Sequence, residues 1–153
     1  MIGVRRSGGA SAEAERIEQR IRDDDLAVAD VVLLAAPHTK ETEGMADAAF
    51  FAAMKPDALL INLGRGALVN EDDLLAALDA GRPGRAWLDV MREEPLPVGH
   101  PFWAHPRVRI TAHDAGVSQA VDARTDALFL DNLKRFLGGR PLRHVADKAL
   151  FSA

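Results

Sequence analysis

Four side chains that could do chemistry follow three consecutive apolar runs of this 153-residue chain. They are Arg65 after the first run, Asp89 and Glu94 around the end of the second, and His113 after the third. An arginine can hold a carboxylate through two hydrogen bonds, and a histidine can exchange a proton near neutral pH. A carboxylate beside the histidine favours its protonated form. An arginine, a carboxylate and a histidine are what hydride transfer on a hydroxy acid requires.

Each of these residues also has an ordinary structural interpretation. His113 could be a loop or interface histidine, Glu94 an exposed acid before a proline, and Asp89 the cap of a turn. Arg65 stands between two glycines, where the backbone can take unusual dihedral angles or approach a ligand closely. The joint pattern is more informative than any single member. The other histidines are interpreted as surface or loop-packing residues: His38, His100, His105 and His144.

The elements that must position these residues are predicted by apolar runs and helix signals. Strands are predicted over 1–4, 30–36, 58–63, 85–90 and 108–111. Helices are predicted over 47–55, from the Asn70 N-cap to a stop at Gly81, and over 118–137. The segment 11–22 is charged and helix-prone, and the acidic run 23–25 is interpreted as a solvated helix end or a loop.

Strands that alternate with helices indicate an α/β fold with a parallel sheet and right-handed crossovers. The carboxyl ends of neighbouring parallel strands meet at one edge of the sheet, where open α/β sheets bind ligands. The polar residues after the three runs are therefore expected in one crevice.

Composition excludes several classes of protein. The net charge of −4 gives no sign of nucleic-acid or membrane binding. The absence of cysteine excludes disulfides and thiolate metal sites and favours a cytoplasmic location, and we expect no bound metal. No apolar run reaches the roughly 18 residues of a membrane span, and the first residues have no targeting pattern.

Several short motifs resemble those of one enzyme family. A pattern Asn-x-x-Arg-Gly-x-x-Val is matched by Asn62, Arg65, Gly66 and Val69. A Leu-Asp-Val segment followed by Glu-Pro-Leu-Pro is matched by 88–90 and 94–97. A histidine loop is matched by Thr111, His113, Ala115 and Gly116, and a turn by Pro37, Thr39 and Thr42. The chain resembles the D-isomer-specific 2-hydroxyacid dehydrogenases, most closely their glyoxylate and hydroxypyruvate reductase branch.

The resemblance implies a role for each site residue. Arg65 would bind the carboxylate of a 2-oxo or 2-hydroxy acid and polarise its carbonyl, and His113 would be the general acid/base with Glu94 as its partner. Hydride would pass between a nicotinamide and the second carbon of the substrate. The cofactor would be contacted by Arg5, Arg6, Ser7, Pro37, Thr42, Asp89 and Gly116. The full-length enzyme would be a homodimer.

The cofactor is predicted from the end of the first strand. NAD-specific relatives place an acid there to bind the ribose 2′-hydroxyl, whereas this chain has Arg5, Arg6 and Ser7. Two cations and a hydroxyl suit a 2′-phosphate. We therefore expect NADP(H) to be preferred, with NAD(H) possible, and Arg6 and Ser7 to be the main contacts. The alternative is a solvated basic turn.

The chain departs from the family pattern in three places. Ala112 stands where a proline is usual, and Asp114 where a branched apolar residue is usual. No G-x-G-x-x-G occurs in the sequence. By resemblance, that motif, the first strand and most of the substrate domain would lie upstream of Met1.

The fold expected is therefore an incomplete Rossmann-like doubly wound sheet that lacks its first strand and glycine-rich turn. Residues 1–116 would form a partial NAD(P)-binding domain, and 117–153 a crossover helix and tail that return toward the substrate domain. The missing strand would leave an unpaired apolar edge on the strand 58–63. We expect the chain alone to be inactive, to bind NADPH very weakly or not at all, and to be poorly soluble or associated with itself. The alternative function is an inactive remnant that serves as a binding or dimerisation module.

Overall fold

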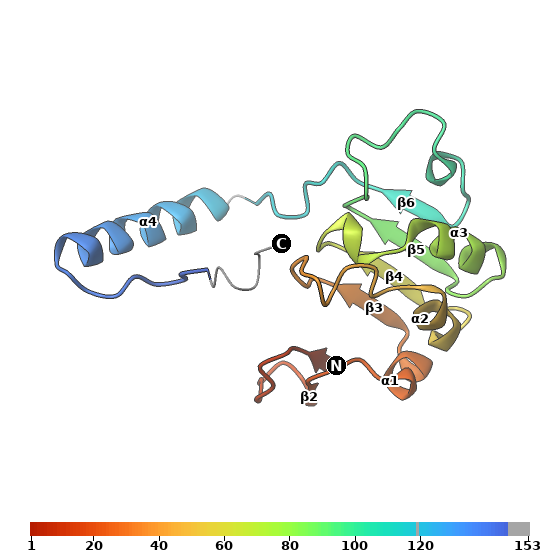
Figure 1. Ribbon diagram of the computed structural model, residues 1–153, viewed down its shortest axis with the longest axis horizontal. Helices are drawn as coiled ribbons and strands as arrows, with labels where there is room; N and C mark the ends of the chain where they lie inside the picture. Colours follow the sequence, from red (N-terminus) through yellow and green to blue (C-terminus); the bar gives the residue numbers. More distant parts are fainter. Residues whose placement is uncertain (119, 147–153) are drawn as a thin grey trace. The chain divides into compact units, whose positions relative to one another are not determined.

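The computed structural model describes residues 1–118 and 120–146, and these form two units that divide between Ala112 and His113. The first unit contains a parallel pair, β1 (Ile2–Val4) and β2 (Arg16–Glu18), and a four-stranded sheet (Figure 1). The larger sheet has the order β3 (Val31–Leu34), β4 (Leu59–Asn62), β5 (Arg85–Leu88) and β6 (Val108–Ile110). All three of its pairings are parallel, which confirms the predicted α/β class.

The helices follow their predicted signals where these are local. The helices are α1 (Asp23–Val28), α2 (Ala48–Ala53), α3 (Glu71–Asp79) and α4 (Val121–Leu137), with short 3₁₀ turns η1 (Gly66–Leu68) and η2 (Pro101–Trp103). The Asp47 carboxylate caps α2 by accepting from the Phe50 amide, and Asn70 caps α3 in the same way. Gly81 takes a φ of +83° just after α3.

One face of the four-stranded sheet is buried beneath α2 and α3. Alternate strand residues point into this core, among them Leu34, Leu60, Ala86, Leu88 and Val108. They share one apolar cluster with Phe51, Met54, Leu74 and Leu78 of the helices and their ends. The other strand residues face away, so that Leu33 and Trp87 stay about half exposed.

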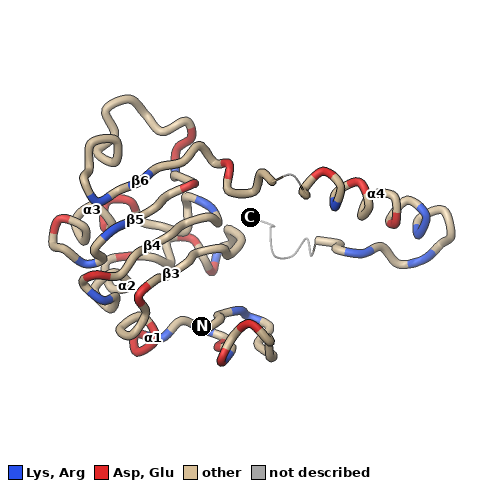
Figure 2. The backbone as a smooth tube through the Cα atoms, turned by 180° about the vertical axis from the view of Figure 1, so that it is seen from behind, with Lys and Arg blue, Asp and Glu red and all other residues tan. Residues whose placement is uncertain are grey.

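The helix-prone segment 11–22 contains no helix. Residues Arg16–Glu18 form β2, in parallel register with β1, and the helix α1 begins only at Asp23. An isolated charged segment with a thin apolar face gains little from helix formation, whereas β1 offers it a ladder of hydrogen bonds. The acidic run is therefore the first turn of α1, as Figure 2 shows, and Asp25 within it is buried.

The edge expected on the strand 58–63 is also wrong. β4 is paired on both sides, and the edge strands of the four-stranded sheet are β3 and β6. The reason is the unrecognised strand β2, because it shifts each later strand one place along the doubly wound order. Val31 and Leu33 on β3 are 53% and 54% exposed.

The second unit consists of α4 and a segment that folds back beside it. The Asn132 side chain accepts from the Arg143 amide (2.8 Å) and donates to the Arg143 carbonyl (3.1 Å). None of the α4 residues is buried. Gln119 of the predicted helix and the predicted tail over 147–153 lie outside the described residues. Among the helices described, none is long and apolar enough to cross a membrane.

Candidate functional site

The loop after β4 is organised by a buried asparagine. The Asn62 side chain accepts from the Gly64 amide (3.1 Å) and donates to the Arg65 carbonyl (3.0 Å). Asn62 is fully buried, whereas Arg65 is exposed in extended backbone. The Arg65 guanidinium donates to the Gly64 carbonyl at 2.6 Å. The asparagine therefore shapes the loop from within and leaves the arginine head at the surface.

The two glycines beside Arg65 allow backbones to pack closely. Neither takes a positive φ. A Cβ on Gly64 would lie 2.8 Å from the Ala36 carbonyl oxygen, and a Cβ on Gly66 would lie 1.9 Å from the Met91 carbonyl carbon. The close approach is thus to the protein's own backbone. It holds the Arg65 loop directly against the loop after β5.

The loop after β5 carries the two predicted carboxylates. The Asp89 amide donates to the Asn62 carbonyl (3.0 Å), and its buried carboxylate accepts from the Thr111 hydroxyl. Glu94 lies further along, and its Oε1 accepts from the Met91 amide at 2.9 Å. The structure therefore brings Arg65, Asp89 and Glu94 to the carboxyl ends of two paired strands. Their roles stay predictions.

His113 is the first residue of the second unit. Its backbone lies in the left-handed region, with a φ of +57°, and it is exposed, as are Ala112 and Asp114. A positive φ is uncommon for a residue with a side chain, but His144 has a similar φ of +53°, so the backbone conformation alone does not mark His113 as functional. The convergence of His113 with Arg65 and Glu94 stays a prediction.

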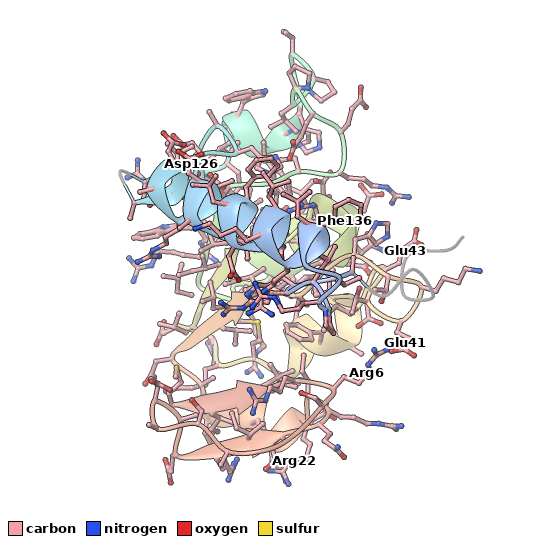
Figure 3. The ribbon with its side chains drawn as sticks, turned by 90° about the vertical axis from the view of Figure 1, so that its left-hand side faces the viewer. Arg6, Arg22, Glu41, Glu43, Asp126 and Phe136 are labelled. Atoms are coloured by element: carbon pink, nitrogen blue, oxygen red, sulfur yellow. The ribbon has the colours of Figure 1, made fainter. Side chains whose placement is uncertain are left out.

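The basic turn after β1 gives its two arginines different surroundings. The Arg5 guanidinium donates to the carbonyls of Gly8 (2.5 Å) and Ala10 (3.2 Å), so it holds its own loop together. Arg6 and Ser7 are exposed, and the Arg6 guanidinium lies 3.8 Å from the Glu41 carboxylate (Figure 3). Because an exposed ion pair is weak, a phosphate could replace that carboxylate. Arg6 and Ser7 are therefore accessible to an anionic ligand, and their contact with a 2′-phosphate stays a prediction.

The turn after β3 is closed by a threonine hydroxyl. The Thr42 hydroxyl donates to the Pro37 carbonyl (2.7 Å) and accepts from the Thr39 amide (2.8 Å). Pro37 and Thr42, both predicted cofactor contacts, thus shape one turn near the end of β3. Gly116, another predicted contact, is exposed in the second unit, and a Cβ on it would meet open space.

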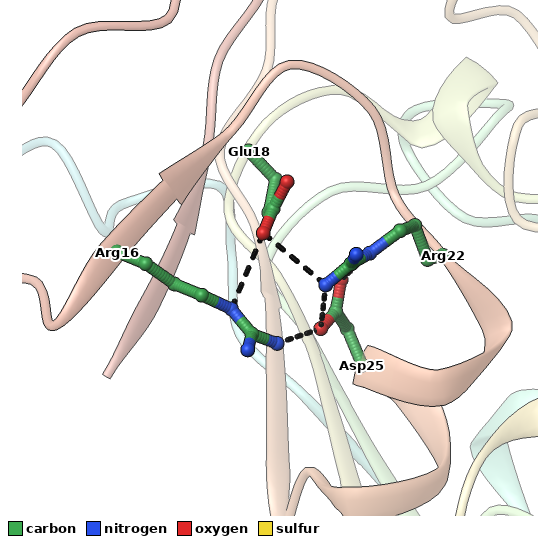
Figure 4. Close-up of polar contacts among 4 residues, drawn as sticks. All are labelled: Arg16, Glu18, Arg22 and Asp25. Carbon is green, nitrogen blue, oxygen red and sulfur yellow. Dashed lines mark hydrogen bonds and ion pairs between the residues drawn. The ribbon is translucent and has the colours of Figure 1, made fainter.

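A charged cluster between β2 and α1 was not predicted from the sequence (Figure 4). Arg16 and Arg22 both contact the Asp25 carboxylate, and Glu18 lies beside both arginines. The hydrogen bond from Arg22 lowers the pKa of Asp25 below its usual value, and the same bond raises the pKa of Arg22. These contacts fasten α1 to β2, so we assign the cluster a structural role.

A parallel sheet with polar residues gathered at the carboxyl ends of its strands is the arrangement in which open α/β domains, those of the Rossmann type among them, bind their ligands. The family model for the D-isomer specific 2-hydroxyacid dehydrogenase, NAD binding domain, matches residues 1–115, and the chain belongs to this family. The predicted resemblance is thereby confirmed.

Individual relatives agree with this assignment. A glyoxylate/hydroxypyruvate reductase A from Yersinia enterocolitica is 51% identical over 82 residues, which are 54% of this chain and 26% of that protein. A D-isomer specific 2-hydroxyacid dehydrogenase from Xanthobacter autotrophicus, solved with NADPH and MES, superimposes with a TM-score of 0.87 and 32% identity, over 97% of this chain and 61% of that one. The NADPH-dependent glyoxylate/hydroxypyruvate reductase of Sinorhizobium meliloti, solved with NADP and sulfate, superimposes with a TM-score of 0.82 and 33% identity. That match covers 99% of this chain and 49% of that one. The chain thus spans about a quarter to three fifths of these proteins.

Proposed function

We propose that this chain carries the cofactor-binding and catalytic part of an NADP(H)-dependent enzyme that reduces 2-oxo acids such as glyoxylate or hydroxypyruvate. The observation that carries the proposal is the packing of the Arg65 loop on the Glu94 loop at the ends of paired parallel strands. The named activity of the Sinorhizobium meliloti neighbour supports the substrate class. The complete enzyme is proposed to be a cytoplasmic homodimer.

The residues of the chain divide the reaction between them. Arg65 binds the substrate carboxylate through its planar fork and draws electron density from the adjacent carbonyl. His113 gives a proton to the carbonyl oxygen as the alcohol forms, and Glu94 stabilises the charged ring. A nicotinamide cofactor, when bound, supplies the hydride. Arg6 and Ser7 hold the 2′-phosphate that distinguishes NADPH from NADH.

The test is a chimera in which this chain replaces the matching part of the Sinorhizobium meliloti reductase. His113→Gln should lower turnover with glyoxylate by about 10²–10⁴-fold, the usual contribution of general acid/base catalysis. Arg65→Ala should raise KM and lower kcat, because the same group binds and polarises. The matched controls are His144→Gln and Arg85→Ala, which remove exposed side chains of the same types elsewhere.

The outcomes separate the two functions that the sequence leaves open. If Arg65→Ala or His113→Gln left the kcat and KM of the chimera unchanged, the assigned roles would be contradicted. A chimera that folds and binds NADPH without reducing either oxo acid would support the inactive remnant instead.

A further inference from the structure

Three acids open α3, and the structure gives each a different environment. The Asp73 carboxylate accepts from the Ala48 amide at the start of α2 (3.1 Å), and Asp72 is exposed. Glu71 points elsewhere, because its Oε1 accepts from the Arg92 amide at 2.7 Å. Its side chain is only 15% exposed. Glu71 therefore reaches from α3 to the loop that follows β5.

A histidine lies against the other oxygen of Glu71. The His100 Nδ1 accepts from the Phe102 amide (3.2 Å) at the start of η2, which places the proton of the neutral ring on Nε2. That Nε2 lies 3.6 Å from the Glu71 Oε2. The Glu71 carboxylate is thus bounded on both sides, which restricts its rotamers and fixes the oxygen that meets Arg92.

The contact at Arg92 lies within the candidate site. Arg92 follows Met91, whose amide donates to Glu94 and whose carbonyl carbon packs against Gly66. On the other side, Glu71 follows the Asn70 cap and the turn η1, which begins directly after Arg65. One short, rigid path therefore runs from Arg65 to the Glu71 carboxylate and from there to the loop of Glu94.

We propose that Glu71 is a positioning residue that fixes the Glu94 loop relative to Arg65. It touches neither substrate nor cofactor, and it acts by holding the Arg92 amide. The consequence for catalysis rests on the proposed function, whereas the effect on the loop does not. An acid that served only the helix dipole would leave the Arg92 amide unaffected when replaced.

The test measures hydrogen exchange of single amides by NMR in the 153-residue chain. Glu71→Ala should speed exchange at Arg92 by about tenfold or more, since a hydrogen bond to a charged acceptor is lost, and exchange at Met91 should rise with it. Glu71→Gln keeps an acceptor oxygen at the same place, so exchange should stay within about threefold of the parent chain. Asp72→Asn is the control, because it removes the same charge from the same helical turn.

A second readout follows catalysis in the chimera with NADPH and glyoxylate. Glu71→Ala should lower kcat while KM for NADPH is unchanged, and Glu71→Gln should restore most of the kcat. Unchanged Arg92 exchange in Glu71→Ala, or an equal change in Asp72→Asn, would overturn the positioning role. The predicted exchange pattern in the 153-residue chain, together with a chimera that has no turnover, would uphold that role and count against the proposed function alone.

Discussion

The substitution Gly66→Ala tests the packing on which the candidate site depends. The added Cβ would lie 1.9 Å from the carbonyl carbon of Met91, 2.0 Å from its oxygen and 2.4 Å from the amide nitrogen of Arg92. All three are backbone atoms, so no side chain can rotate out of the way. Ordinary Cβ contacts begin near 3.4 Å, and in a close-packed interior the two loops must therefore separate by about 1.5 Å.

The expected cost has two parts. Overpacking of a buried contact costs about 1–3 kcal/mol. Separation of the loops also stretches the 2.7 Å hydrogen bond from the Arg92 amide to Glu71, which adds about 1 kcal/mol. The free energy of unfolding should fall by about 2–4 kcal/mol, a large part of the 5–15 kcal/mol typical of a domain.

The assay is urea unfolding of the 153-residue chain, followed by circular dichroism. Gly116→Ala is the control, because a Cβ there meets open space and its φ is not positive. That variant should not lower the free energy of unfolding and should raise it by up to about 1 kcal/mol, because no clash offsets the smaller entropy of the unfolded chain. At a site without a clash, alanine in place of glycine would stabilise the chain by about 0.4–1 kcal/mol. A Gly66→Ala chain at least as stable as the parent would refute the packing argument.

Three further predictions follow from other parts of the first unit. Asp25 has a lowered pKa because Arg22 donates a hydrogen bond to it. Its contribution to stability is therefore present above its usual pKa and is lost as the pH falls through the lowered value. Asp25→Asn should lower the free energy of unfolding at neutral pH and flatten its dependence on acid pH, in unfolding curves measured at a series of pH values. Leu33→Lys places a charge on the exposed edge strand and should reduce self-association in light scattering, whereas Val98→Lys, on a loop, should not. In the chimera, Arg6→Ala should weaken NADPH binding by about tenfold or more in calorimetry and leave NADH binding unchanged. Equal losses for both cofactors would contradict a 2′-phosphate contact.

Features encoded by neighbouring residues could be predicted from the sequence. The side chains of Asp47 and Asn70 each cap a helix by accepting from the amide three residues further along. The strands β3 to β6 are apolar runs with clear ends. The order of β4, β5 and β6 then followed from the parallel class, and with it the grouping of Arg65 with Asp89 and Glu94. These parts needed no knowledge of distant contacts.

Features that depend on distant partners could not be predicted. β2 is only three residues long, and its own sequence has no strand pattern. It is a strand because it pairs with β1. The close packing at Gly66 depends on the position of the Met91 backbone. In the same way, the role of Glu71 depends on the position of the Arg92 amide. The sequence shows Glu71 as one of three acids at a helix start, and nothing local distinguishes it from Asp72.

The order of the larger sheet has a consequence for how the chain folds. Each of its strands pairs with the strand that follows it in the sequence, from β3 through to β6. Each of β4, β5 and β6 can therefore pair, as it leaves the ribosome, with the strand that precedes it in the sequence. The sheet can grow by one strand at a time during synthesis. The loops of Arg65 and Glu94 can then come together once β5 has paired with β4, before β6 has left the ribosome.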